Sequence, residues 1–262
     1  MTGAAIPDPL LDPDEPDPAA LDNEAGGSAF FLTCDHGGRA IPRRLGRLGL
    51  PKPETFRHIA WDIGVAAVGR LLSAQLDAAL IVQEYSRLVI DCNRDPSVPS
   101  SIAEISEDTP IPGNCGLDPA GRTARIEAVF RPYHDRIGAA LDRRRALRQP
   151  TMLVALHSFT PVYKGVSRPW HVGVLYNRDA RLAHPFLGLL RAEGDLTVGD
   201  NEPYRVTDQT DYTVPVHGER RGLPYLEIEI RQDLIAEPSG QANWAERLAR
   251  LLPAAHAELP PA

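Results

Sequence analysis

The sequence predicts an α/β protein with a largely parallel sheet and helices on both of its faces. Short apolar runs, typical of buried strands, alternate along the chain with stretches whose apolar residues recur at helical spacing. The chain has 262 residues, of which 43% are hydrophobic, enough for one large domain or two small ones. No apolar run approaches the roughly 20 residues that a membrane-spanning helix needs.

Each predicted element follows from its local pattern. Compact or alternating apolar segments predict strands over residues 29–34, 78–83, 87–92, 151–159, 170–177 and 223–234. Apolar residues at helical spacing predict helices over residues 58–76, 122–148, 180–194 and 243–253, the second of them broken near Pro132. Residues 95–121 contain repeated Pro and Gly and are expected to form a long irregular loop, which in a compact domain is often functional.

The net charge of −7 belongs to the N-terminal segment. Residues 1–28 contain seven acidic residues and no Lys or Arg, so the remaining 28 acidic residues balance the 28 Lys and Arg residues. Because this segment also has five prolines and few large apolar residues, we expect residues 1–28 to be a disordered acidic tail. Residues 29–262 are expected to form a single domain, whose activity should survive deletion of the tail. Because the charges of residues 29–262 sum to zero, this domain lacks the basic surplus that binding to nucleic acid or to a membrane surface would require.

The cysteine count predicts a reducing environment. Three cysteines are too few, and odd in number, for a disulfide framework. The N-terminus lacks the basic and apolar regions of a secretory signal. We therefore expect a cytoplasmic protein, either a monomer or a homodimer.

Two histidines stand at the ends of predicted strands, where ligands bind in α/β sheets. His36 follows the first strand and precedes two glycines, which allow close backbone approach, and His157 lies near the end of a later strand. Together with a carboxylate they make a catalytic zinc site plausible. The alternative for each is a histidine that only satisfies local hydrogen bonds.

Other candidate residues suit the handling of an anionic substrate. Arg94, assisted by Asn93, could bind a carboxylate in a bidentate manner, and Arg87 lies at the start of the same segment. Arg168 adds a further cation after the His157 strand. For Arg94 and Arg87 the alternative is a surface ion pair, and for Arg168 it is a solvated basic surface.

Two glutamates in the late strand are candidate general bases. Glu227 and Glu229 are two residues apart and so point to the same face of the strand. A half-desolvated carboxylate has a raised pKa, which suits proton transfer. Glu229, between two isoleucines, is the first candidate and Glu227 the second, while a buried ion pair is the alternative role for either.

Several motifs together resemble the N-formylglutamate amidohydrolase family, especially its shorter bacterial members. They are CDHGGRAIP (34–42), DIG (62–64), SRLVIDCNR (86–94), PYH (132–134), LHSFTP (156–161) and EIRQDLI (229–235). That family resembles the zinc carboxypeptidases and aspartoacylases, so the resemblance implies a three-layer fold with a mixed, mostly parallel sheet. It also implies a zinc-dependent amidohydrolase, foremost one that releases formate and L-glutamate from N-formyl-L-glutamate in histidine degradation.

The resemblance assigns roles to particular residues. It implies His36 and His157 as zinc ligands, Asn93 and Arg94 as the carboxylate site, and Glu229 as the general base or acid. The wider superfamily takes a further ligand from a Glu three residues after the first His, but this chain has Arg39 there. Asp62 is the predicted replacement, with Asp35 and Glu84 as alternatives. Asp62 could also be structural, pairing with an arginine or capping its helix.

Because Arg39 stands in place of this glutamate, two other functions are alternatives. One is a catalytically weakened domain that binds an anionic amino-acid derivative. The other is a hydrolase of a different N-acyl amino acid or of a small peptide.

Overall fold

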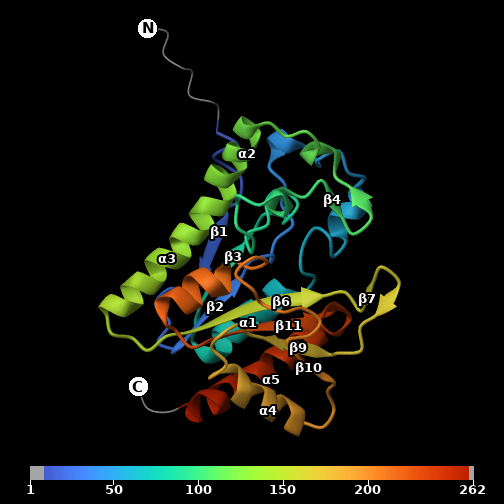
Figure 1. The fold of residues 1–262 in the computed structure, drawn as a ribbon. Coiled ribbons are helices and arrows are strands. Elements are labelled where there is room, and N and C mark those ends of the chain that lie inside the picture. Colours follow the sequence, from blue (N-terminus) through green and yellow to red (C-terminus); the bar gives the residue numbers. More distant parts are fainter. Residues whose placement is uncertain (1–8, 260–262) are drawn as a thin grey trace.

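The computed structural model describes residues 9–259, and a seven-stranded sheet runs through its centre (Figure 1). The sheet order is β1-β3-β2-β6-β11-β9-β10. Its strands are β1 (Ala19–Asp22), β2 (Phe30–Cys34), β3 (Ala79–Gln83), β6 (Met152–Phe159), β9 (Val172–Leu175), β10 (Val198–Asp200) and β11 (Tyr225–Arg231). β1 pairs antiparallel with β3, and β9 pairs antiparallel with β11, while the other neighbours are parallel. The predicted mixed, mostly parallel sheet is therefore confirmed.

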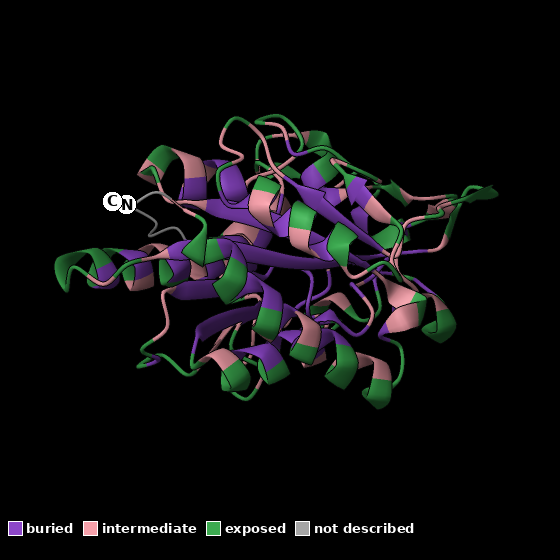
Figure 2. Cartoon of the chain, turned by 90° about the horizontal axis from the view of Figure 1, so that it is seen from below, coloured by how far each residue is buried: buried purple, intermediate pink, exposed green. Residues whose placement is uncertain are grey.

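Helices cover both faces of this sheet. α1 (Val65–Leu76), α4 (Ala183–Ala192) and α5 (Pro238–Ala257) pack on one face, and α3 (Arg131–Ala146) packs on the other (Figure 1). All residues of β2 and β6 are buried, as expected for strands covered on both sides (Figure 2). Each face of the sheet therefore has its own apolar core.

The helix predicted over 122–148 changes its hydrogen-bond pattern before Pro132 but does not end there. α2 (Pro119–Arg125) is followed by a π-helical turn over Ile126–Phe130, and α3 then begins at Arg131, directly before Pro132. The residues at both junctions keep right-handed helical dihedral angles, so the expected break is a local change from α- to π-helix at the proline, which lacks the N–H of a regular turn.

Two small hairpins stand apart from the main sheet. β4 (Ile105–Ser106) pairs with β5 (Thr109–Pro110), and β7 (Val162–Tyr163) pairs with β8 (Val166–Ser167). The first hairpin lies within the segment 95–121 that was expected to be an irregular loop. The sequence analysis also missed the second hairpin and β10, all of which are too short to give a pattern.

The prediction of a strand over residues 87–92 is wrong. This segment is buried but turns on itself, with the Val89 N–H donating to the Ser86 carbonyl at 2.9 Å. Side chains from elsewhere serve its carbonyl groups: Asn114 Nδ2 donates to the Leu88 oxygen at 3.0 Å, and Arg125 Nη1 donates to the Val89 oxygen at 3.0 Å. An apolar run indicates that a segment is buried, but not that it forms a strand. Here the backbone hydrogen-bonding groups find partners without a neighbouring strand.

The prediction of disorder over residues 1–28 is wrong for the part of that segment that the structure describes. Ala19–Asp22 form β1 on the edge of the sheet, and Ala19 is buried. Acidic residues of the segment contact basic residues of the body: Glu24 accepts from Arg143 Nη1 at 2.8 Å, and Asp14 pairs with Arg43. Residues 1–8 lie outside the described residues. Acidic side chains of this segment therefore lie beside basic side chains of the body, while the β1–β3 pairing holds the segment in the sheet.

The docked segment changes the expected effect of a deletion. A chain that begins at Ala29 should have a melting temperature lower by about 5 °C or more, because it loses the β1–β3 pairing and the burial of Ala19. Thermal unfolding followed by circular dichroism measures this shift. Asp14→Asn is the control, since its exposed ion pair should contribute little. An unchanged melting temperature for the deletion would show that β1 adds no stability.

Candidate active site

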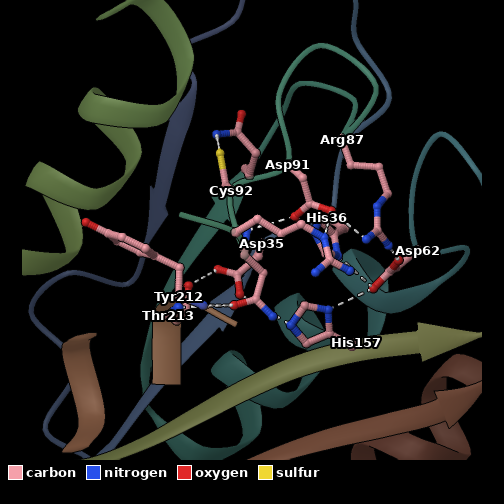
Figure 3. Close-up of polar contacts among 12 residues, drawn as sticks. Asp35, His36, Asp62, Arg87, Asp91, Cys92, His157, Tyr212 and Thr213 are labelled. Carbon is pink, nitrogen blue, oxygen red and sulfur yellow. Dashed lines mark hydrogen bonds and ion pairs between the residues drawn. The ribbon is translucent and has the colours of Figure 1, made fainter. Parts of the chain in front are cut away.

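A cavity of about 500 Å³ lies beyond the carboxyl ends of β2, β6 and β11. Its floor holds the ends of these strands, and its walls include the β4–β5 hairpin and Tyr163 of β7. Because β2, β6 and β11 run in the same direction, residues distant in sequence meet at this edge. Figure 3 shows the polar residues that converge there.

The structure brings His36, Asp62 and His157 together in this cavity. One potential ligand atom from each lies within 4.8 Å of the others, and all three side chains are buried. Asp62 Oδ2 lies 3.5 Å from Nδ1 of His36 and 3.0 Å from Nδ1 of His157 (Figure 3). The carboxylate therefore faces the same nitrogen of both rings.

The other nitrogen of each ring faces a second carboxylate. His36 Nε2 lies 2.7 Å from Asp91 Oδ1, and His157 Nε2 lies 3.3 Å from Asp35 Oδ2. Asp35 is held in turn by hydrogen bonds from the hydroxyls of Tyr133 at 2.7 Å and Thr213 at 2.8 Å. Carboxylates in this position fix the ring orientation of metal-binding histidines and leave the opposite nitrogen for the metal.

This donor set fits a metal ion. His36 Nδ1 is buried and has no hydrogen-bond partner among residues 9–259. Two imidazole nitrogens and a carboxylate oxygen are a ligand set that zinc accepts in catalytic sites, with a position left for water or substrate. The group His36–Asp62–His157 could therefore bind a metal.

Two glycines allow the backbone to approach closely around these ligands. A Cβ at Gly38, two residues after His36, would lie 2.0 Å from the Glu84 carbonyl oxygen. Gly64, two residues after Asp62, has a φ of +81°, and a Cβ there would lie 2.1 Å from the Ile235 oxygen. These contacts explain why glycine follows each ligand.

The side chain three residues after His36, where the family resemblance led us to look for a further ligand, points elsewhere. Arg39 is exposed, and its guanidinium lies 4.2 Å from the ring centroid of Phe56. Of the three carboxylates considered as substitutes, Asp62 faces both histidines, Asp35 faces the far side of His157, and Glu84 pairs with Arg70 at 2.7 Å. Only Asp62 of these belongs to the three-residue group.

Glu227 and Glu229 both line the cavity from β11. Glu229 lies opposite His157 in the strand register, and Glu227 Oε2 lies 3.9 Å from His157 Nε2. Burial raises the pKa of Glu229 to about 7 and raises the pKa of Glu227 well above its usual value. The Oε2 atom of each has no hydrogen-bond partner among the described residues. The charges that act on Glu229 are those of the three-residue group and of Arg87, which places this carboxylate beside them.

The predicted substrate-binding residues Arg87, Asn93 and Arg94 line the same cavity, but each already has protein partners. Arg87 Nη2 donates to Asp91 Oδ2 at 2.6 Å, and its Nη1 lies 3.5 Å from Asp62 Oδ1. These ion pairs hold the pKa of Asp91 well below its usual value despite burial. Arg87 therefore helps to position two carboxylates, that of Asp91 and that of Asp62.

Asn93 and Arg94 tie the cavity wall to the segment before β11. Asn93 Oδ1 accepts hydrogen bonds from the backbone N–H groups of Tyr212 at 3.0 Å and Thr213 at 3.1 Å. Arg94 Nη1 donates to the Thr210 carbonyl at 2.9 Å, and its Nε lies 3.7 Å from Asp91 Oδ2. Asn93 is thus committed to structure, whereas Arg94, which also lines the cavity, makes its one hydrogen bond with residues 9–259 through Nη1.

Arg168 lies outside the set of residues that line the cavity. Its guanidinium lies 4.7 Å from the ring centroids of both Tyr163 and Tyr204, and Nη1 donates to the Tyr204 hydroxyl at 2.7 Å. Tyr163 and Tyr204 do line the cavity, so Arg168 acts on it through these two rings.

The sequence analysis missed the direct partners of the two histidines. The sequence analysis gives no role to Asp91 and considers Asp35 only as a substitute metal ligand. The signal for Asp91 was a carboxylate directly after the apolar run LVI, where burial without a partner is costly. No local pattern showed that it would meet His36, 55 residues away in the sequence.

No helix among residues 9–259 has the length and apolarity required to cross a membrane.

Residues 28–236 match the model of the N-formylglutamate amidohydrolase family. The structure is similar to that of a gene product of Agrobacterium tumefaciens, with 40% sequence identity, a TM-score of 0.91 and coverage of 95% of this chain and 98% of that chain. It is also similar to the N-formylglutamate amidohydrolase of Ralstonia eutropha JMP134, with 20% identity, a TM-score of 0.68 and coverage of 92% and 98%, a likeness of fold. No curated protein matches the chain.

Proposed function

Because the chain belongs to the N-formylglutamate amidohydrolase family, and is therefore a hydrolase that acts on an amide bond, we propose that it is a metal-dependent enzyme that cleaves N-formyl or N-acyl amino acids. N-formyl-L-glutamate is the foremost candidate substrate. The observation that carries this proposal is the buried group His36–Asp62–His157 on the floor of a cavity that Glu229 also lines.

In this proposal His36, Asp62 and His157 hold Zn²⁺. The ion supplies Lewis acidity, which polarises the amide carbonyl and makes water acidic enough to attack near neutral pH. Asp91 and Asp35 keep the two imidazoles oriented, since each faces the ring nitrogen that points away from Asp62.

Glu229 is the proposed general base. Its buried carboxylate has no hydrogen-bond partner among residues 9–259 and a pKa raised to about 7, so it exchanges a proton readily near neutrality. It removes a proton from the attacking water and delivers it to the leaving amine. Glu227 is more deeply buried, and burial raises its pKa well above its usual value, which favours the uncharged form of this side chain.

Arg94 is the proposed anchor of the α-carboxylate of the substrate. Arg94 lines the same cavity as His36, Asp62 and His157, and this shared cavity supports the role. The α-carboxylate is the anionic group nearest to the scissile amide. Anchoring it there removes orientational freedom from the reaction.

A catalytically weakened binding domain is the less favoured alternative. It rested on the missing superfamily glutamate, and Asp62 provides a carboxylate that faces both histidines. The free cysteines Cys34, Cys92 and Cys115 are compatible with a reducing compartment, so a cytoplasmic location stays a prediction.

Metal analysis and a substrate panel test the proposed function. We expect about one zinc per purified chain, and amine release from N-formyl-L-glutamate at a higher kcat/KM than from its N-acetyl or neutral N-formyl counterparts. Treatment with a chelator should remove activity, and added Zn²⁺ should restore it. Absence of amine release from the whole panel by zinc-loaded protein would contradict the proposal.

A further inference from the structure

Tyr204 lines the cavity from the segment between β10 and β11. The Arg168 guanidinium lies over its ring and over that of Tyr163, 4.7 Å from both centroids. Nη1 of Arg168 also donates a hydrogen bond to the Tyr204 hydroxyl at 2.7 Å. The backbone N–H of Arg168 donates to the Pro161 carbonyl at 2.8 Å, which ties this arginine to the base of the β7–β8 hairpin. One side chain thus holds both the ring and the hydroxyl of Tyr204.

The hydroxyl proton of Tyr204 is available to a ligand. Because a guanidinium has no acceptor atom, the phenol oxygen accepts from Arg168 and its own proton points elsewhere. That proton has no acceptor among residues 9–259. Partial burial and the charge of Glu229 raise the pKa of Tyr204, so the hydroxyl keeps its proton near neutral pH. Tyr204 therefore offers a hydrogen-bond donor.

Electrostatics place this hydroxyl on the side of the cavity where the proposed reaction occurs. Apart from Arg168, the charges that act on it are those of Glu229 and Arg87, and that of Glu229 is the largest. Glu229 is the proposed general base and lies opposite His157 in the strand register. A donor beside Glu229 is therefore a donor beside the reacting amide.

Other donors in this part of the cavity are committed to the protein. Ser158 and Thr160 line the cavity, but their hydroxyls donate to backbone carbonyls at 3.0 and 2.9 Å. Arg87 is held by two carboxylates. An oxygen atom that gains negative charge during the reaction is thus met by few uncommitted donors, and Tyr204 supplies one.

We propose that the Tyr204 hydroxyl donates a hydrogen bond to the oxygen of the amide that is hydrolysed, and that Arg168 positions this hydroxyl. The inference rests on the proposed function and adds to it one catalytic and one positioning residue. Attack of water on the amide carbon moves an electron pair onto the carbonyl oxygen, and the pair returns when the amine leaves. A donor held in place beforehand stabilises this charge more than it stabilises the neutral amide, and the phenol keeps its proton throughout.

Tyr204→Phe tests the catalytic role because it removes the hydroxyl and keeps the ring. In the zinc-loaded protein with N-formyl-L-glutamate, kcat should fall by about 10- to 100-fold, the usual strength of a hydrogen bond to a charged group, while KM stays within a few-fold. Tyr176→Phe is the matched control. Its hydroxyl donates to Asp200 at 2.8 Å outside the set of residues that line the cavity, so this variant should keep both constants.

Binding gives a readout that needs no turnover. N-(methylphosphonyl)-L-glutamate is a phosphonamidate with a tetrahedral P–O⁻ group where the substrate has the attacked carbonyl, and L-glutamate lacks that group. Calorimetry should show that Tyr204→Phe weakens the binding of the phosphonamidate by about the factor by which it lowers kcat/KM. The affinity for L-glutamate should stay unchanged.

A double variant tests the positioning role of Arg168. Arg168→Gln should lower kcat, and its combination with Tyr204→Phe should lower kcat no further than Tyr204→Phe alone, because Arg168 acts through the hydroxyl. Arg168→Lys, which can still donate to the hydroxyl, should retain more activity than Arg168→Gln. Losses that add in the double variant would remove Arg168 from this role.

Three results would overturn the catalytic role of Tyr204. They are an unchanged kcat in Tyr204→Phe, an equal loss of affinity for the phosphonamidate and for L-glutamate, and a loss of kcat in Tyr163→Phe instead. Failure of the wild type to hydrolyse any member of the substrate panel would contradict the proposed function, and the comparison of the two bound molecules would still decide this inference.

Discussion

His157→Ala is expected to abolish both metal binding and turnover. The substitution removes an imidazole whose Nδ1 lies 3.0 Å from Asp62, and a buried site that retains one histidine and one carboxylate binds zinc weakly. Zinc content per chain after dialysis should fall from about one to near zero. Amine release from N-formyl-L-glutamate should fall by about 1,000-fold or more, because the Lewis acid is lost.

Two controls separate a lost metal site from a lost fold. His184→Ala removes an exposed histidine on α4 and should keep both zinc and activity. Asp62→Asn retains the size of the side chain and should also lose most of the zinc, with a circular dichroism spectrum like that of the wild type. Retention of one tightly bound zinc and full activity by His157→Ala would remove this residue from the ligand set.

Glu229→Gln is expected to lower kcat by about 100- to 10,000-fold while the protein keeps its zinc, because the amide cannot accept a proton. The side chains are nearly equal in shape, so substrate binding should change little and KM should remain within a few-fold of the wild-type value. Steady-state kinetics with N-formyl-L-glutamate, together with metal analysis of the same sample, measures both quantities.

Glu227→Gln is the matched comparison on the same strand. Burial raises the pKa of the Glu227 carboxyl well above its usual value, so replacing it by a neutral amide should lower kcat far less than at Glu229, within about 10-fold. A larger loss at Glu227 than at Glu229 would exchange the two roles. Similar small losses at both positions would exclude either residue as the general base.

The fold could be predicted from the sequence because its inner strands are covered on both sides. β2, β6 and β11 give continuous or alternating apolar runs, and the helices on either face give helical spacing. The same reasoning failed at residues 87–92, whose apolar run is buried among loops rather than paired with a strand. It failed again at β1, whose acidic, proline-rich surroundings conceal four residues that pair with β3.

The sequence predicted those residues of the candidate site that lie at or near the ends of buried strands. His36 follows β2, and His157 lies near the end of β6. Asp62 was proposed as the ligand that replaces the glutamate expected from the family resemblance. The contacts of Asp91 and Asp35 were not predictable, because they join loops far apart in the sequence.

The placement of β1 has a consequence for self-association. Without β1, β3 would be the outermost strand on that side. The backbone N–H and C=O groups of Ala79–Gln83, in a strand of mostly apolar side chains, would then be unpaired and open to other molecules. β1 covers this row, is only four residues long and ends in Asp22, so the edge that remains is a poor template for another chain. The N-terminal segment therefore protects the protein from aggregation through its sheet edge.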